Sequence, residues 1–206
     1  MGESPKFERP TTLEEEHELT LERSKYLLEH IANQEEQHSI EHLTRLKTRK
    51  VFDTELKLIF GEVEEKRHGV EPVKKIALIL IDLDYFKQVN DTKGHAAGDE
   101  VLREVSALLI ESVRPTDTVA RFGGEELVVL MRGADMQAAK HHAEELRAKI
   151  QELRFAAYPG LEITASFGVC STDVSDKTNS STLLEQVDVA LYKAKNGGRN
   201  RVEIYK

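Results

Sequence analysis

The chain lacks most features that mark secreted, disulfide-stabilised or membrane-spanning proteins. Its 206 residues include no tryptophan and a single cysteine, Cys170, so no disulfide can form within the chain. The longest apolar run, Ile76–Ile81, is far shorter than the ~20 residues that a membrane-spanning helix needs. No apolar segment follows a basic N-terminus, so we expect no secretory signal. These absences predict a cytoplasmic protein without a membrane span, in which Cys170 is a small apolar strand residue.

An excess of positive charge is also missing. The formal net charge is −8, and residues 1–40 contribute most of it, with ten Glu against two Lys and two Arg. This leaves −2 for residues 41–206. The balance argues against nonspecific nucleic-acid binding. An anionic ligand of residues 41–206 would therefore need a metal ion or local Lys and Arg side chains.

The sequence predicts two parts: an acidic N-terminal linker, residues 1–40, and one domain, residues 41–206. Thr12 and Glu15 have the spacing of a capping box that opens a helix, which would run to about Gln37. Its apolar residues follow a heptad spacing only in part. Two interpretations stay open: a helix that pairs with a second copy and so promotes dimerisation, or a solvated helix packed on the domain.

Apolar patterns in residues 41–206 predict alternating strands and helices. The segment Lys75–Leu83 is apolar on both faces, which is typical of a central strand covered by helices. A hairpin is expected over residues 118–131, because Gly123-Gly124 between apolar runs favours a two-residue type I′ turn. Further helices are expected at Lys50–Arg67, Gly98–Val113, Asp135–Leu153 and Ser181–Asn196, and further strands at Ile163–Ser171 and Val202–Tyr205. This order predicts an α+β fold with a ferredoxin-like βαββαβ core, a central antiparallel sheet flanked by helices, preceded by the N-terminal linker helix.

Carboxylates follow both the central strand and the hairpin glycines. Asp82 ends the strand, and Glu125 and Glu126 come directly after Gly124. In a ferredoxin-like sheet a hairpin strand lies beside the first strand, so we expect Asp82 and Glu125 to meet and share a hard cation such as Mg²⁺. Each has a simpler interpretation by itself. Asp82 could be a helix N-cap, and the glutamates could be charges that guard a sheet edge.

Polar residues elsewhere suit a nucleotide. The Asp99 carboxylate can accept two N–H bonds from guanine, and Asn90 can donate and accept at the same base. Lys195 and Arg199 suit phosphate oxygens, although cations are also favourable near a helix C-terminus. Together with the carboxylates, these residues predict a site for a guanine nucleotide, a divalent metal and neutralised phosphates.

Four strings of residues share their order and spacing with one known family. They are Asp82–Asp91, Gly94–Asp99, Arg121–Glu126 and Ala190–Arg201. From about Glu41 to Tyr205 the chain resembles the GGDEF family of diguanylate cyclases, in a variant whose signature is Gly-Gly-Glu-Glu-Leu. The resemblance implies an enzyme that condenses two GTP into cyclic di-GMP and two pyrophosphate.

The resemblance also implies roles for individual residues. Asp82, the Leu83 carbonyl and Glu125 would hold Mg²⁺ or Mn²⁺, two ions per site, and Glu125 or Glu126 would assist catalysis. The implied GTP-binding residues are Tyr85, Phe86, Lys87, Asn90, His95, Asp99, Gly123, Gly124, Lys195 and Arg199. One site holds one GTP, so catalysis would need a homodimer.

The segment Arg114-Pro115-Thr116-Asp117 matches the family's RxxD motif just ahead of the hairpin. The resemblance implies that cyclic di-GMP binds at Arg114 and Asp117 and inhibits the enzyme. Four residues of this kind are also typical of a solvated turn. Product inhibition at this turn is therefore an expectation that rests on the resemblance.

Two places depart from the family pattern. Leu127 replaces the last aromatic residue of the signature, and we expect it to point inward and alter packing rather than chemistry. Glu41, Arg45 and Thr48 replace the family's Asp, Gly and Asn, and a glycine there usually serves a special backbone angle. Two alternatives to an active cyclase remain: a non-enzymatic receptor for cyclic di-GMP or GTP, and a nucleotidyl cyclase that uses another base.

Overall fold

The computed structural model describes residues 39–61, 73–174 and 178–206. The chain divides into two units, Met1–Ser39 and Ile40–Lys206, and the described residues belong almost entirely to the second. The helix expected from Thr12 to about Gln37, and its pairing with a second copy, lie outside the described residues. None of the described helices is both long enough and apolar enough to cross a membrane.

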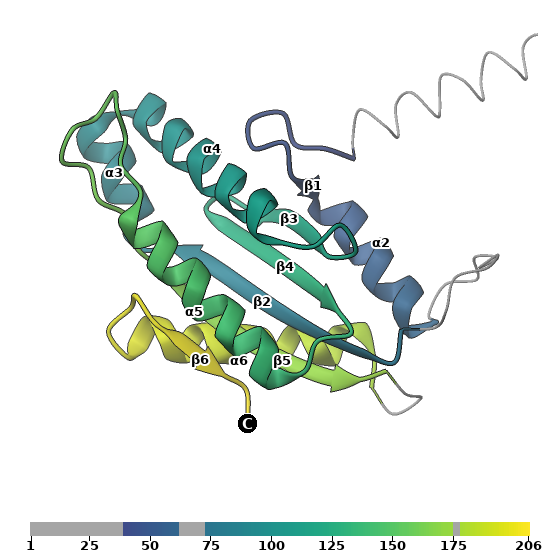
Figure 1. Cartoon of the computed structure of the whole chain (residues 1–206). Coiled ribbons are helices and arrows are strands. Elements are labelled where there is room, and N and C mark those ends of the chain that lie inside the picture. Colours follow the sequence, from purple (N-terminus) through teal and green to yellow (C-terminus); the bar gives the residue numbers. More distant parts are fainter. Residues whose placement is uncertain (1–38, 62–72, 175–177) are drawn as a thin grey trace, which may run out of the picture. The chain divides into compact units, whose positions relative to one another are not determined.

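A six-stranded mixed sheet in the order β1-β3-β4-β2-β5-β6 forms the centre of the described unit (Figure 1). Its strands are β1 (Lys47–Thr48), β2 (Lys75–Leu83), β3 (Thr118–Gly123), β4 (Glu126–Arg132), β5 (Ala165–Asp173) and β6 (Val202–Ile204). The four central strands pair antiparallel, whereas β1 and β6 each pair parallel with a neighbour. The order β3-β4-β2-β5 is that of a ferredoxin-like sheet. The predicted α+β class and antiparallel centre are confirmed, and the edge strand β1 is an addition.

Helices cover both faces of this sheet (Figure 1). One face carries α3 (Phe86–Lys93), α4 (His95–Ser112) and α5 (Met136–Glu152), and the other carries α2 (Arg49–Phe60) and α6 (Ser180–Asn196). Side chains of β2 alternate between them, so that Ile79 packs with the first group and Leu80 with the second. The unbroken apolar run of β2 therefore has the predicted cause, which is burial on both faces.

The end of α2 differs from the prediction. The helix ends at Phe60 rather than Arg67, because Gly61 adopts a left-handed φ of 71° and donates its N–H back to the carbonyls of Lys57 and Leu58. The apolar pattern predicts a helix from Lys50 to Arg67, but the C-cap at Gly61 ends the helix earlier.

The helices after β2 also differ. The apolar pattern does not predict α3, since Phe86 and Val89 are its buried apolar side chains and two residues make no periodic face. Helix α4 begins at His95 instead of Gly98. Strand β5 begins at Ala165 instead of Ile163, although the Ile163 side chain is also buried.

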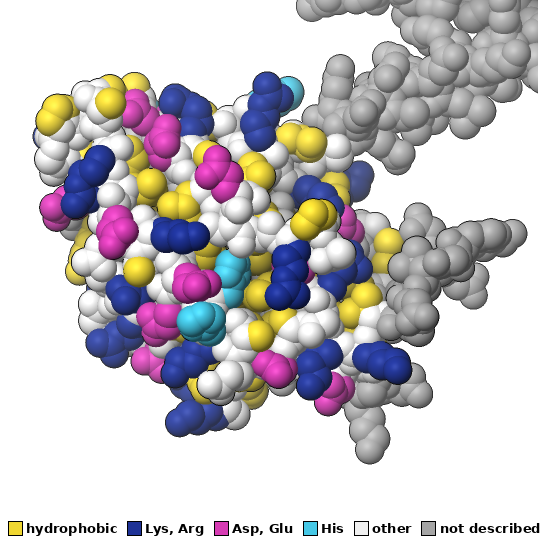
Figure 2. Space-filling view, in the orientation of Figure 1, with side chains coloured by type: hydrophobic (Ala, Val, Ile, Leu, Met, Phe, Trp, Pro, Cys, Tyr) yellow, Lys and Arg dark blue, Asp and Glu magenta, His cyan; other side chains and the backbone are white. Residues whose placement is uncertain are grey.

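Charged side chains of both signs are interspersed over the face that carries α4 and α5 (Figure 2). This mixture agrees with the near-neutral charge of residues 41–206. Attraction for an anionic nucleotide must therefore come from local groups of side chains rather than from the field of the whole domain.

Candidate functional site

The register of the sheet places two carboxylates opposite each other. Asp82 at the end of β2 pairs with Glu126 at the start of β4. Both residues have the strand parity of Leu80 and Val128, whose side chains pack with α6, so both point toward that face. The partner of Asp82 in the register is thus Glu126, while Glu125 lies in the turn, where its carbonyl accepts a 3.4 Å hydrogen bond from the Leu83 N–H.

The hairpin turn is not the predicted type I′ turn over Gly123-Gly124. The ladder shifts between Arg121 and Gly123, and Gly123 pairs with Glu126, so the turn residues are Gly124 and Glu125. Gly124 has a left-handed φ of 51°, but Glu125 does not have a positive φ. A type I′ turn needs φ > 0 at both positions, so that assignment is wrong. The shift leaves one glutamate in the exposed turn and sets the other at the first position of β4.

Arg121 holds this turn in place. Its Nε and one terminal nitrogen donate to the Gly124 carbonyl at 3.0 and 2.8 Å, and its other terminal nitrogen lies 3.2 Å from Glu41 Oε1. Glu41 also accepts from the backbone N–H and the hydroxyl of Thr44. Burial alone would raise the Glu41 pKa, but these bonds outweigh it and leave the pKa below its ordinary value. Arg121 belongs to the signature string, but the sequence alone indicates no role for it.

Lys195 near the end of α6 forms an ion pair with Asp82, with Nζ 2.7 Å from Oδ2. Asp82 is buried, and its burial raises the pKa of the carboxyl, as does repulsion from Glu125 and Asp84, while the Lys195 ammonium opposes the shift. The structure shows Lys195 as the counterion of Asp82. Phosphate binding by this lysine stays a prediction from the sequence.

The same edge of the sheet fits a hard divalent cation. Burial raises the Glu126 pKa, and repulsion from Asp82 raises it further. A cation beside these groups would relieve that repulsion, and carboxylate and carbonyl oxygens are the donors that Mg²⁺ and Mn²⁺ prefer. Asp82, Glu126, Glu125 and the Leu83 carbonyl supply only such donors. Within residues 39–61, 73–174 and 178–206, however, no three acidic, His or Cys side chains already form a metal-ligand cluster.

Asp84 is a second buried carboxylate, and it joins three segments. It accepts hydrogen bonds from the hydroxyls of Thr164 and Ser166 at 2.7 and 2.6 Å and from the Asn200 backbone N–H at 3.0 Å. These bonds tie the end of β2 to β5 and to the loop that carries Arg199. Asp84 belongs to the same sequence string as Asp82. The string alone does not show that Asp84 has structural hydrogen-bond partners while Asp82 is the candidate metal ligand.

The start of α3 is suited to an anion. Tyr85 precedes the helix with a left-handed φ of 57°, and backbone N–H groups at a helix N-terminus favour negative charge. The Arg199 guanidinium lies over the Tyr85 ring, 4.8 Å from its centroid. The Phe86 side chain is buried, so its backbone alone can face a ligand, whereas Lys87 is exposed.

Helices α3 and α4 meet where the predicted guanine-binding residues lie. A Cβ added to Gly98 would stand 2.0 Å from Asn90 Oδ1, so the absent side chain of Gly98 makes room for the Asn90 amide. Asp99 follows on α4 and is exposed, as is His95 at the start of the helix. The structure thus places Asn90 against Gly98, the neighbour of Asp99 in the sequence, and the residue pattern alone does not reveal this role of Gly98.

Arg114 and Asp117 lie in the turn between α4 and β3. Asp117 accepts from the Arg114 and Arg132 backbone N–H groups at 3.3 and 3.0 Å, and Arg114 is exposed. Leu127 is fully buried, as predicted for an inward strand residue. Its neighbour across the sheet on β2 is Ile81.

Most of the chain matches a known protein family. Residues 38–201 match the family model described as "Diguanylate cyclase, GGDEF domain". Diguanylate cyclase A of Treponema denticola is 37% identical over 166 residues, covering 80% of this chain and 43% of that protein. Diguanylate cyclase DosC of Escherichia coli is 34% identical over 164 residues, covering 80% of this chain and 34% of that protein. The chain therefore spans less than half the length of these curated relatives.

A solved structure is similar over nearly the whole chain. The coiled coil and GGDEF domain of DgcB from Caulobacter crescentus, in complex with c-di-GMP, has a TM-score of 0.76 and 30% sequence identity. The match covers 93% of this chain and 98% of that one.

Proposed function

The chain belongs to the GGDEF family of diguanylate cyclases, and on this premise we propose that it condenses two GTP into cyclic di-GMP with release of two pyrophosphate. The observation that carries the proposal is the pairing of Asp82 with Glu126 beside Lys195 at one end of the sheet. This arrangement gathers acidic oxygens and an ammonium group where a nucleoside triphosphate with its metal could bind.

Asp82, the Leu83 carbonyl and Glu125 are the proposed ligands of Mg²⁺ or Mn²⁺, two ions per site. When bound, such ions lower the pKa of the attacking 3′-hydroxyl and neutralise charge on the α-phosphate. Glu126 or Glu125 accepts the proton of that hydroxyl. The raised Glu126 pKa supports a basic carboxylate that binds a proton more readily than an exposed one.

The nucleotide is held at both ends. Asn90 and Asp99 hydrogen-bond the guanine, and Gly98 keeps Asn90 in position. The backbone at the start of α3, with Lys195 and Arg199, binds the terminal phosphates. A metal ion held by Asp82 would neutralise that carboxylate, and Lys195 would then be available to bind the phosphates.

Catalysis requires two copies of the chain. One site holds one GTP, and its 3′-hydroxyl must attack the α-phosphate of the other, so two domains must face each other. Residues 1–40 are the proposed pairing element, which raises the effective concentration of one site near the other. The coiled coil present in the similar DgcB structure supports this assignment. Cyclic di-GMP bound at Arg114 and Asp117 inhibits the enzyme.

One assay tests the activity. The purified chain with GTP and Mg²⁺ is expected to give cyclic di-GMP and pyrophosphate in a ratio of one to two, and ATP should give no cyclic dinucleotide. Glu125→Ala should abolish the product, while Glu152→Ala, which removes an exposed glutamate of α5, should not. Absence of product from a sample shown to be dimeric by ultracentrifugation would contradict the proposal and favour a receptor.

A further inference from the structure

A pocket of about 390 Å³ lies between the turn before β1 and the turn before β3. Its walls include the residues Ile40, Arg45, Lys47, Ile110, Arg114 and Asp117. Ile40 and Ile110 are each 46% exposed, which is high for large apolar side chains. The volume lies in the range of small-molecule sites. Apolar side chains next to arginines suit a flat base that carries a phosphate.

Arg45 has an unusual backbone in this pocket. Its φ is 60°, in the left-handed region that costs a non-glycine residue conformational energy. The turn is closed by hydrogen bonds from Arg45 N to Glu41 O and from Glu41 N to Leu46 O, both 2.8 Å. Glycine would adopt this angle without strain. A strained arginine where glycine is favoured indicates that its side chain has a use.

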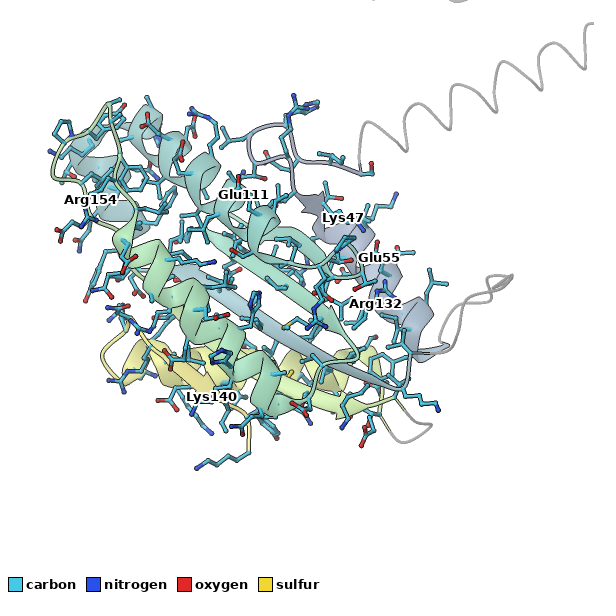
Figure 3. The ribbon with its side chains drawn as sticks, viewed as in Figure 1. Lys47, Glu55, Glu111, Arg132, Lys140 and Arg154 are labelled. Atoms are coloured by element: carbon cyan, nitrogen blue, oxygen red, sulfur yellow. The ribbon has the colours of Figure 1, made fainter. Side chains whose placement is uncertain are left out.

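The charged side chains that line the pocket differ in whether another group of the protein already pairs with them. Lys47 is paired with Glu55 on α2, and Figure 3 shows both close to Arg132. Asp117 is held by backbone N–H groups. For the guanidinium groups of Arg45 and Arg114, by contrast, no hydrogen bond or ion pair is found within residues 39–61, 73–174 and 178–206. Both side chains are exposed. Two arginines are thus available for an anion.

We infer that Arg45 is a ligand-binding residue of this pocket, where it and Arg114 bind the phosphates of a guanine dinucleotide. The inference rests on the proposed function in one respect, because cyclic di-GMP is the guanine dinucleotide that the proposed reaction produces. Cyclic di-GMP carries two phosphodiester charges, one for each arginine. Ile40 and Ile110 provide the apolar surface for a guanine ring.

Isothermal titration of the purified full chain with cyclic di-GMP tests the inference. Arg45→Gly removes the cation and also the backbone strain, so its Tm should equal or exceed that of the parent. Its Kd for cyclic di-GMP should nevertheless rise about tenfold or more, the loss expected for a charged hydrogen bond. Arg45→Gln keeps the strain and loses the charge, and should weaken binding similarly. Arg45→Lys should retain part of the affinity.

Arg154→Ala is the matched control, because Arg154 lies at the far end of the domain from Lys47 (Figure 3). Its Kd should equal that of the parent chain. The inference is overturned if Arg45→Gly and Arg45→Gln bind as tightly as the parent while Arg114→Ala does not. It is also overturned if the parent chain binds no cyclic di-GMP.

Product formation is measured separately, so the two proposals fail in different ways. A chain that makes no cyclic di-GMP but binds it through Arg45 would contradict the proposed activity and keep the inference. A chain that makes cyclic di-GMP and binds it independently of Arg45 would do the reverse.

Discussion

The Lys195 ammonium and the Asp82 carboxylate lie 2.7 Å apart and join the end of α6 to the end of β2. Asp82 is buried, Glu126 faces it across the sheet, and the Lys195 side chain is one-third exposed. The lysine therefore compensates a carboxylate that has acidic neighbours. A bound metal ion would compensate the same charge, so the lysine and the ion have overlapping electrostatic roles.

Lys195→Ala should lower the free energy of unfolding by about 1–3 kcal/mol without metal. This lies between the values for exposed and buried ion pairs, because only one partner is buried. Urea denaturation in the presence of a chelator measures the loss. Saturating Mg²⁺ should stabilise the variant more than the parent chain, since its Asp82 has no other counterion. Lys193→Ala removes an exposed lysine of the same helix and should change stability little; an equal loss there would contradict this account.

Glu126→Gln should raise the Tm at pH 7. Burial and repulsion raise the pKa of Glu126 in the folded chain above its ordinary value of 4.5. A raised pKa means that the protonated carboxyl stabilises the fold and that its charge at pH 7 opposes it. The stability contributed by protonated Glu126 is fully present below pH 4.5, and it is lost as the pH rises through the pKa of Glu126 in the folded chain. The difference in Tm should therefore shrink on acidification and vanish below pH 4.5.

Thermal melts of both chains between pH 4 and pH 8, without metal, check this dependence. Glu152→Gln is the control, because Glu152 is exposed at the end of α5. Its Tm should follow the parent chain at every pH. A Glu126→Gln variant that is less stable than the parent at pH 7 would show that Glu126 has a stabilising partner instead.

Gly98→Ala should weaken GTP binding without unfolding the domain. The new Cβ would collide with Asn90 Oδ1, which is the end of a side chain that can rotate away. Loss of the hydrogen bonds proposed between Asn90 and guanine should raise the Kd for a non-hydrolysable GTP analogue about tenfold. A double-mutant cycle is decisive, because Gly98→Ala should have no further effect once Asn90→Ala is present. Additive losses would separate the two residues.

The α+β core was predictable because its signals are long and strong. Strand β2 appears in the sequence with its observed bounds, Lys75–Leu83, since a strand buried on both faces is an unbroken apolar run. Helix α3 was not predictable, because a short helix with two buried apolar residues has no periodic face. The predicted end of α2 was wrong for another reason. The apolar pattern of the sequence continues past Gly61, but the helix ends there.

The site was predictable as a set of residues but not as a set of contacts. Residue types identified Asp82, Asn90 and the two glutamates as candidates. The ion pair of Asp82 with Lys195 joins residues 113 positions apart, and no local pattern encodes it. Glu126 is the register partner of Asp82 because the hydrogen-bond ladder shifts after Arg121. The Gly-Gly pair in the sequence does not predict this shift.

Strand β4 begins with two residues that face opposite sides of the sheet. Glu126 points toward α6 and the acidic end of β2, while Leu127 is buried under α4 and α5. One inserted or deleted residue in the turn would exchange them, burying a carboxylate in the core and exposing a leucine to the acids. The length of this hairpin is therefore constrained twice, by folding and by chemistry. A change of side chain at one position leaves the register intact, whereas a change in the residue count reverses both faces of the strand.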